Sequence, residues 1–429
     1  MTLDPAETTR DGKRSGGDDD SSGVANGERR PGGRSVASMF FALLMVMAAC
    51  SDNRSTKTTS TADRPVTTTS HPHLVAPVAD PIPITARQCL ERPPTHVTVI
   101  AGSVTDQRRV DAPAADQTYD ARTAIFTGDG TVPPGTTTPQ IYPLLLGKQI
   151  PSTGTCVVGG SVRGNLDRAM TWPQLKAEKA QPNGALLYFD AAALTVFERG
   201  DGGHLVDGFR VDDVSDGVAA RGSFAASGKL PLDGGNFYLR NAYFTYVHDD
   251  CVDVNDLVSS IVYDSLFDGC YTGVSERPDS TSPLLRYHAA PGQQFVLDHV
   301  LMHMAAFLGP HPTTSCPTGT PSGYNEMFKW SPNANDLVVR NSVFLLDRAP
   351  CSDRYFPFPE SATLQNVTIV WAGVGPWRWS RPVGLQVTTD RSVWDTARVA
   401  WLRRHGCAST TPDIAATANA CTNMTDPTP

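Results

Sequence analysis

The sequence predicts an all-β protein, a right-handed parallel β-helix (solenoid) in which short strands stack coil upon coil. Three observations favour this fold: a recurring apolar motif around Asn or Asp, the spacing of that motif, and a scarcity of hairpin turns. In each motif the Asn or Asp stands between an apolar pair and another short apolar strand. The six central residues are Asp207, Asn241, Asp264, Asp298, Asn341 and Asn366.

Successive members of this series are 34, 23, 34, 43 and 25 residues apart. A base unit near 23 to 25 residues with insertions is typical of a solenoid whose loops vary in length. One coil cannot bury its apolar face alone, but coils stacked about 4.8 Å apart share hydrogen bonds and a continuous core. Asn or Asp recurring at one turn can bond the backbone of the neighbouring coil. A β-sandwich would instead show evenly spaced hairpins.

The composition agrees with a turn-rich β protein. The 429 residues include 36 Gly and 34 Pro, many of them between short apolar runs. Charged residues make up 19% of the chain and the formal net charge is −8, without a Lys/Arg cluster in the part expected to fold. We therefore expect no nucleic-acid partner, and we expect a monomer.

Residues 1–50 are expected to direct export. A polar stretch, 1–35, precedes an apolar run at 39–49, which is too short to span a bilayer but suits a signal-peptide core. The run ends in Met-Ala-Ala-Cys, which resembles a bacterial lipobox. Cys50 is then the expected lipidation site, and the lipid would anchor the protein to the membrane of the cell envelope. A plain secretory signal cut nearby is the alternative.

Residues 51–86 form a Ser/Thr/Pro-rich linker, and the β-helix domain is expected at 87–429. If Cys50 carries lipid, the other eight cysteines are an even number, which favours disulfides formed outside the cytoplasm. Their pairing stays open. Short helices are expected at 171–180 and 393–404, the second to cap the open edge of the last coil.

A second alignment concerns the strand later in each coil, where 216–221, 250–255 and 272–277 correspond. If Val218, Val252 and Val274 point inward, alternation sends Ala219, Asp253 and Ser275 outward as one column. The next outward column is then Arg221, Asn255 and Arg277, which places both arginines within reach of the carboxylates. Glu276 falls on the inward side, and we expect a bend at Arg277-Pro278 to turn it outward.

The candidate site is the segment 248–256, in which four carboxylates and a histidine crowd together. Crowded like charges gain nothing in stability and are typical of functional sites. The candidate catalytic residues are His248, Asp249, Asp250, Asp253 and Arg277, and the candidate substrate-binding residues are Asp216, Arg221, Lys329 and Trp330.

Asp249-Asp250-Cys251-Val252 is similar to the D-D-C-V segment of polygalacturonase-type glycoside hydrolases. Those enzymes are parallel β-helices in which acidic residues act as acid and base. Their N-T-D corresponds here only to Ser215-Asp216-Gly217, and their G-H-G and R-I-K do not occur. The resemblance implies shared architecture. More broadly, 185–375 resembles bacterial secreted β-helix proteins of the pectate lyase-like superfamily.

Several uses of the segment remain open, with polysaccharide as the expected partner. As a hydrolase, two carboxylates about 5–9.5 Å apart would cleave a glycosidic bond, one of them held protonated. As a lyase, Asp250 and Asp253 would hold Ca²⁺ against a uronate while Arg277 abstracts or stabilises a proton. A non-catalytic module would bind glycan with the same strip, and a scaffold would use Asp to accept backbone N–H bonds in turns.

Other aromatic and histidine residues are weaker candidates. Trp377 and Trp379 are expected to pack over the last coil rather than to form a sugar platform. His299 and His303 are expected to be surface histidines, since no carboxylate or cysteine is spaced to complete a metal site with them.

Overall fold

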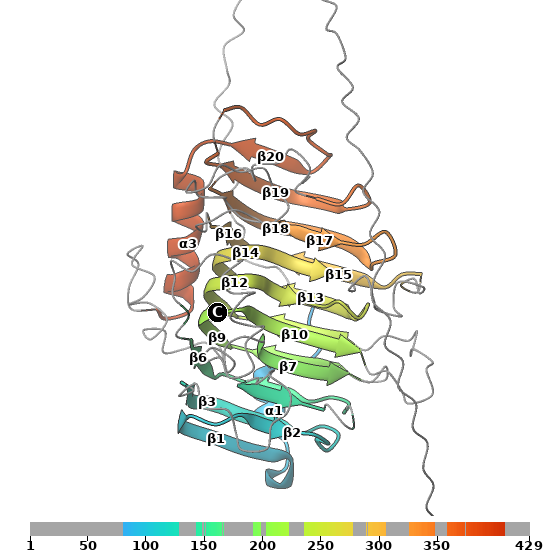
Figure 1. The fold of residues 1–429 in the computed structure, drawn as a ribbon, viewed down its shortest axis with the longest axis vertical. Helices are drawn as coiled ribbons and strands as arrows, with labels where there is room; N and C mark the ends of the chain where they lie inside the picture. Colours follow the sequence, from blue (N-terminus) through green and yellow to red (C-terminus); the bar gives the residue numbers. More distant parts are fainter. Residues whose placement is uncertain are drawn as a thin grey trace, which may run out of the picture. The chain divides into compact units, whose positions relative to one another are not determined.

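The computed structural model describes residues 80–127, 143–147, 150, 152–164, 166, 192–198, 203–222, 236–277, 289, 291–305, 326–347, 358–373 and 375–407. All of them belong to one contact unit, 69–429. In this part of the chain 20 strands pair in parallel and form the predicted right-handed parallel β-helix (Figure 1). The expected leader with Cys50, linker residues 51–79 and the helix at 171–180 lie outside the described residues.

The strands stack in three sheets, which follow one another around each coil. The ladder starts with β1 (Val97–Val104) on β3 (Thr118–Phe126), whose two halves continue into the first and second sheets. The first sheet contains β5 (Cys156–Val158), β8 (His204–Asp207), β11 (Asn236–Arg240), β13 (Ser259–Tyr263), β15 (Gln294–Asp298) and the first halves of β18 (Asp336–Leu346) and β19 (Thr363–Trp371).

The second sheet contains β6 (Ser161–Arg163), β9 (Arg210–Val214), the first halves of β12 (Tyr243–Asp253) and β14 (Leu266–Glu276), β16 (Leu301–Met304), the ends of β18 and β19, and β20 (Leu385–Thr388). The third contains β2 (Arg108–Val110), β4 (Leu144–Leu146), β7 (Ala192–Glu198), β10 (Asp216–Gly222), the second halves of β12 and β14, and β17 (Phe328–Trp330).

The turn between the first and second sheets is made by a column of residues with left-handed backbone. Gly, Asn and Asp adopt this conformation most easily, which explains the recurring motif. Its members are Gly159, Gly208, Asn241, Asp264, His299, Asn341 and Asn366, with φ between 41° and 74°. The predicted series was therefore wrong by one residue at two places, because Asp207 and Asp298 belong to the preceding position of the turn.

Asp207 and Asp298 still hold neighbouring coils together through their side chains. Asn241 Nδ2 donates to Asp207 Oδ1 at 2.7 Å, and Asn341 Nδ2 donates to Asp298 Oδ1 at 3.0 Å. The coils are thus joined at this turn by side-chain bonds between neighbouring coils. The sequence had suggested bonds from these side chains to the backbone.

The interior is a continuous apolar core, as the alternation predicted. Val218 pairs with Val252 and Val252 with Val274, and all three are fully buried. Phe244 and Phe267 stack in the same interior with ring centroids 5.0 Å apart. Because apolar side chains of one coil pack on those of the next, each coil buries the apolar face that it could not bury alone.

The C-terminal helix is confirmed as α3 (Ser392–Arg404), but it lies along the flank of the coils instead of capping their edge (Figure 1). Its side chains Trp394, Trp401 and Leu402 pack on the outer face of the second sheet, against residues such as Tyr243 and Leu301. This outer face carries an apolar strip that includes Tyr243, Leu266 and Leu301, so the helix buries apolar surface along several coils at once. Trp377 and Trp379 pack against the core beside Trp371, as predicted.

Polar contacts fix the helix in register with the flank. Arg398 Nε donates to Asp268 at 2.5 Å, and Trp401 Nε1 donates to the Asp264 carbonyl at 3.0 Å. His303 lies between Asp268 (3.1 Å) and Asp347 (2.9 Å) with 12% of its side chain exposed. The expectation of surface histidines without carboxylate neighbours was therefore wrong, and His299 likewise lies 2.8 Å from Asp298.

Two short helices precede the ladder, α1 (Ala86–Leu90) and the 3-10 helix η1 (Pro94–His96). The Cys89–Cys156 disulfide ties α1 to β5, and Cys251–Cys270 joins β12 to β14. Cys407 is disulfide-bonded as well, so every cysteine among the described residues is oxidised, as predicted. In the described part of the chain, no helix has the length and apolarity needed to cross a membrane.

Candidate functional site

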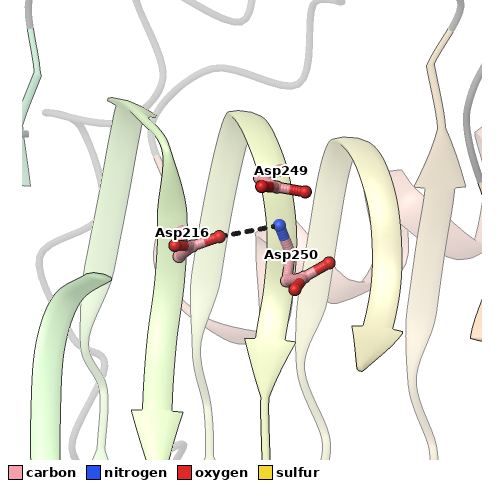
Figure 2. A group of neighbouring side chains, drawn as sticks. All are labelled: Asp216, Asp249 and Asp250. Atoms are coloured by element: carbon pink, nitrogen blue, oxygen red, sulfur yellow. Dashed lines mark hydrogen bonds between the residues drawn. The ribbon is translucent and has the colours of Figure 1, made fainter. Parts of the chain in front are cut away.

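The acidic segment lies on β12, where the second sheet bends into the third. Figure 2 shows Asp249 and Asp250 on this strand and Asp216 on the neighbouring β10. The Asp250 backbone N–H donates to Asp216 Oδ1 at 3.0 Å. One oxygen from each of the three carboxylates lies within 4.8 Å of the others.

A β-bulge puts two consecutive aspartates on the same side of β12. Val247 pairs with Val214 and Cys270 in the adjacent coils, and Val252 pairs with Val218 and Val274. Between these two valines β12 contains one residue more than either neighbour, and its register with β14 shifts there. In a regular strand Asp249 and Asp250 would point to opposite faces, so the bulge brings them together.

Lys329 on β17 completes the cluster. Its Nζ donates to Asp249 Oδ1 at 2.9 Å and to Asp250 Oδ1 at 2.5 Å. Lys329 extends the predicted outward column, because it pairs with Ser275, which pairs with Asp253. Burial alone would lower the pKa of Lys329, but the two carboxylates reverse this and raise it, so the ammonium keeps its charge.

Asp250 has a strongly altered pKa. Burial raises it to about 8, the charges of Asp249, Asp253 and Asp216 act in the same direction, and the Lys329 ammonium opposes them. This shift favours the protonated form of Asp250 near neutral pH. A carboxyl group of this kind can donate its proton to a reacting oxygen.

The two arginines of the predicted column have different partners. Arg221 donates to both oxygens of Asp253, at 2.5 and 3.3 Å, as its position in the alignment predicted. Arg277 instead donates to both oxygens of Glu326 at 3.2 Å, while its backbone N–H donates to Asn255 Oδ1. The expected contact of Arg277 with the aspartates is therefore not made.

Three other predicted residues are enclosed by the fold. His248 is buried, with its Nε2 3.9 Å from Asp213 Oδ1. Trp330 belongs to the inward column, where its ring packs edge-on against Phe295 and its Nε1 donates to the Asn335 carbonyl. It was expected to line the cleft, but alternation along β17 turns Lys329 outward and Trp330 inward.

Glu276 is also inward and fully buried, so the expected bend does not bring it to the surface. Its Oε1 accepts from the Asn335 backbone N–H at 3.0 Å. Burial raises the pKa of Glu276 well above its usual value, which favours the protonated form of this carboxyl group.

The geometry does not suit the expected calcium site. The described carboxylates that could share an ion are Asp216, Asp249 and Asp250, whereas Asp253 is bonded to Arg221. Calcium takes six to eight oxygen ligands. The Lys329 ammonium already lies between Asp249 and Asp250 and supplies the positive charge there.

The cluster is well enclosed. Asp249 and Asp250 are each 6% exposed and Asp253 is 4% exposed, while Asp216 is half-buried. Enclosure strengthens every electrostatic interaction among these groups. It also leaves little of Asp249, Asp250 and Asp253 exposed to a ligand.

No family model, curated protein or solved structure matches the chain, and the fold and the site rest on the geometry described above.

Proposed function

We propose that this protein is exported, is anchored to the cell envelope by a lipid on Cys50, and hydrolyses a polysaccharide at the Asp216–Asp249–Asp250–Lys329 cluster. The observation that carries the proposal is the enclosed group of three carboxyl groups, Asp216, Asp249 and Asp250, in which burial raises the pKa of Asp250. Glycoside hydrolysis requires such a pair, one carboxyl group as acid and one as base or nucleophile. The parallel coils and the D-D-C-V segment also support a place in the pectate lyase-like superfamily.

In this mechanism Asp250 donates its proton to the glycosidic oxygen as the bond to the anomeric carbon breaks. Asp216 or Asp249, each with an oxygen within 4.8 Å of an Asp250 oxygen, attacks that carbon as the nucleophile and forms a glycosyl ester. Water then hydrolyses the ester and gives its proton to the Asp250 carboxylate, which restores the starting state. Lys329 holds Asp249 and Asp250 in place by donating to both. The lyase alternative is less well supported, because Arg277 is bonded to Glu326.

A non-catalytic role is the second candidate, favoured by the burial and ion pairing of Asp249, Asp250 and Asp253. The cluster would then stabilise a glycan-binding or structural β-helix at the cell surface.

The test compares Asp250→Asn with the wild-type protein in a screen of acidic and neutral polysaccharides, with and without Ca²⁺. Thermal unfolding is measured in parallel. Loss of product release with a melting temperature that is unchanged or higher supports the hydrolase. Turnover that persists in Asp250→Asn refutes the acid role of this residue.

A further inference from the structure

Glu276 places a carboxyl group in an apolar column of the core. The residues at this position in the two preceding coils are Ala220 and Val254, which are fully buried, and Trp330 follows in the next coil. Burying a carboxyl group costs free energy that an apolar side chain would not cost. Its presence here therefore calls for a specific role.

The carboxyl group holds the turn 331–335, which joins β17 to β18. Glu276 Oε1 accepts from the Asn335 backbone N–H at 3.0 Å. Asn335 is held at two further points, since its Nδ2 donates to the Val258 carbonyl at 3.0 Å and its own carbonyl accepts from Trp330 Nε1 at 3.1 Å. These three bonds fix the turn against the core.

The turn acts on the candidate site because it follows Lys329 directly. β17 is three residues long, and in the described part of the chain it pairs with β14 alone. Arg277 bonds to Glu326 before the strand, and Glu276 holds the turn after it. A strand this short, paired on one side, depends on such anchors to keep its position.

We propose that Glu276 is a positioning residue, which fixes the 331–335 turn from inside the core and thereby sets the Lys329 ammonium between Asp249 and Asp250. The effect on turnover rests on the proposed function, whereas the effect on the Asp250 carboxyl group does not.

Glu276 exerts this effect without a charge of its own. Its Oε2 and the Oδ1 of Asn335 are buried, and neither has a hydrogen-bond partner among the described residues. A proton on the carboxyl group supplies a donor where acceptors are in excess. Burial also raises the pKa of Glu276, which favours that form.

The test follows the titration of the Asp250 carboxyl group by NMR in the full chain. Glu276→Val removes the acceptor of the Asn335 N–H and inserts the residue type found at Val254. Lys329 should then move away, and the pKa of Asp250 should rise by about one unit or more, because an opposite charge in contact lowers a carboxyl pKa by about 1–3 units. Glu276→Gln keeps an acceptor and adds a donor, so the titration should stay as in the wild-type protein.

Ser342→Ala is the matched control. It removes the acceptor of the buried Val300 backbone N–H in the coil of Lys329, away from the 331–335 turn, and should lower stability without moving the titration. An unchanged Asp250 pKa in Glu276→Val, or an equal rise in Ser342→Ala, overturns the proposal. A fall in Glu276→Val or Glu276→Gln also overturns it, since removing a nearby negative charge lowers this pKa.

Two further measurements complete the test. If Glu276→Val does not fold, Trp330→Phe replaces it, because this variant loses the bond to the Asn335 carbonyl, and absence of a rise there overturns the proposal. Product release from the polysaccharide that the wild-type protein cleaves should fall in Glu276→Val and return in Glu276→Gln. The expected rise in a protein that cleaves no polysaccharide supports the positioning role and refutes the proposed function. Wild-type turnover with an unshifted Glu276→Val overturns the positioning role alone.

Discussion

Lys329 Nζ lies 2.5 Å from Asp250 Oδ1, although 79 residues separate them in the sequence. The same ammonium reaches Asp249 at 2.9 Å, so a single cation holds two consecutive aspartates together. The contact exists because β17 stacks on β14, which in turn stacks on β12.

Replacing Lys329 by Met should destabilise the fold markedly. The substitution leaves Asp249 and Asp250 enclosed without their cation, and breaking a buried pair in this way costs about 3–5 kcal/mol. Denaturant unfolding measures the loss. At pH 9, above the Asp250 pKa of about 8, both carboxyl groups are ionised, and in the double variant Lys329→Met/Asp250→Asn part of the stability should return, because one of the two repelling charges is gone. A double variant as unstable as Lys329→Met would contradict the coupling.

Asp250 should make stability depend on pH. Its folded pKa of about 8 lies above the usual value of 3.8, so the folded protein binds this proton more tightly than the unfolded chain. The resulting stability is complete below about pH 4 and is lost as the pH rises towards 8. Thermal unfolding between pH 4 and 9 should show this decline in the wild-type protein and less of it in Asp250→Asn. Equal slopes in both proteins would disprove the raised pKa.

The Cys251–Cys270 disulfide should position the bulge. Cys270 pairs with Val247 just before the extra residue, and Cys251 follows Asp250 directly. Replacing both cysteines by Ala should lower stability by about 2–5 kcal/mol and also alter the titration of Asp250. The matched control, replacement of Cys89 and Cys156, should lower stability without changing that titration. NMR of the Asp250 carboxyl group distinguishes the two variants.

His303 should control the docking of α3 at alkaline pH. Burial lowers its pKa, but bonds to Asp268 and Asp347 outweigh this and raise it to about 9. Its contribution is therefore full below about pH 6.5 and is lost as the pH rises through 9. Trp394 lies beside the ring, with centroids 5.9 Å apart, so its fluorescence should report the loss. In His303→Gln this pH dependence should disappear. A fluorescence profile identical to that of the wild-type protein would reject the role of His303.

The lipid anchor on Cys50 is tested in cells. A fatty-acid probe should label the wild-type protein and should not label Cys50→Ala. Labelling that is unchanged in the variant would refute the lipoprotein prediction and leave the plain secretory signal.

Local sequence was enough to predict the coils and the direction of most side chains. Val218, Val252 and Val274 could be aligned because alternation along a strand depends only on neighbouring residues. The left-handed turn was recognised by its Asn and Asp residues. It was misplaced by one residue at Asp207 and Asp298. In those two coils the left-handed residue is Gly208 or His299 instead of the expected Asn or Asp.

The details of the candidate site depended on the tertiary structure. The bulge that brings Asp249 and Asp250 to one side is one extra residue, and it appears only when β12 is counted against β9, β10 and β14. The position of α3 on the flank likewise depends on the apolar outer face of the second sheet, which several coils build together. Sequence alone thus determined the repeat, through the spacing of its Asn and Asp residues. It also determined the inward columns, because these follow from period-two alternation. Stacking between coils decided the ion pairs and the pKa of Asp250, because both depend on distances between residues far apart in the chain.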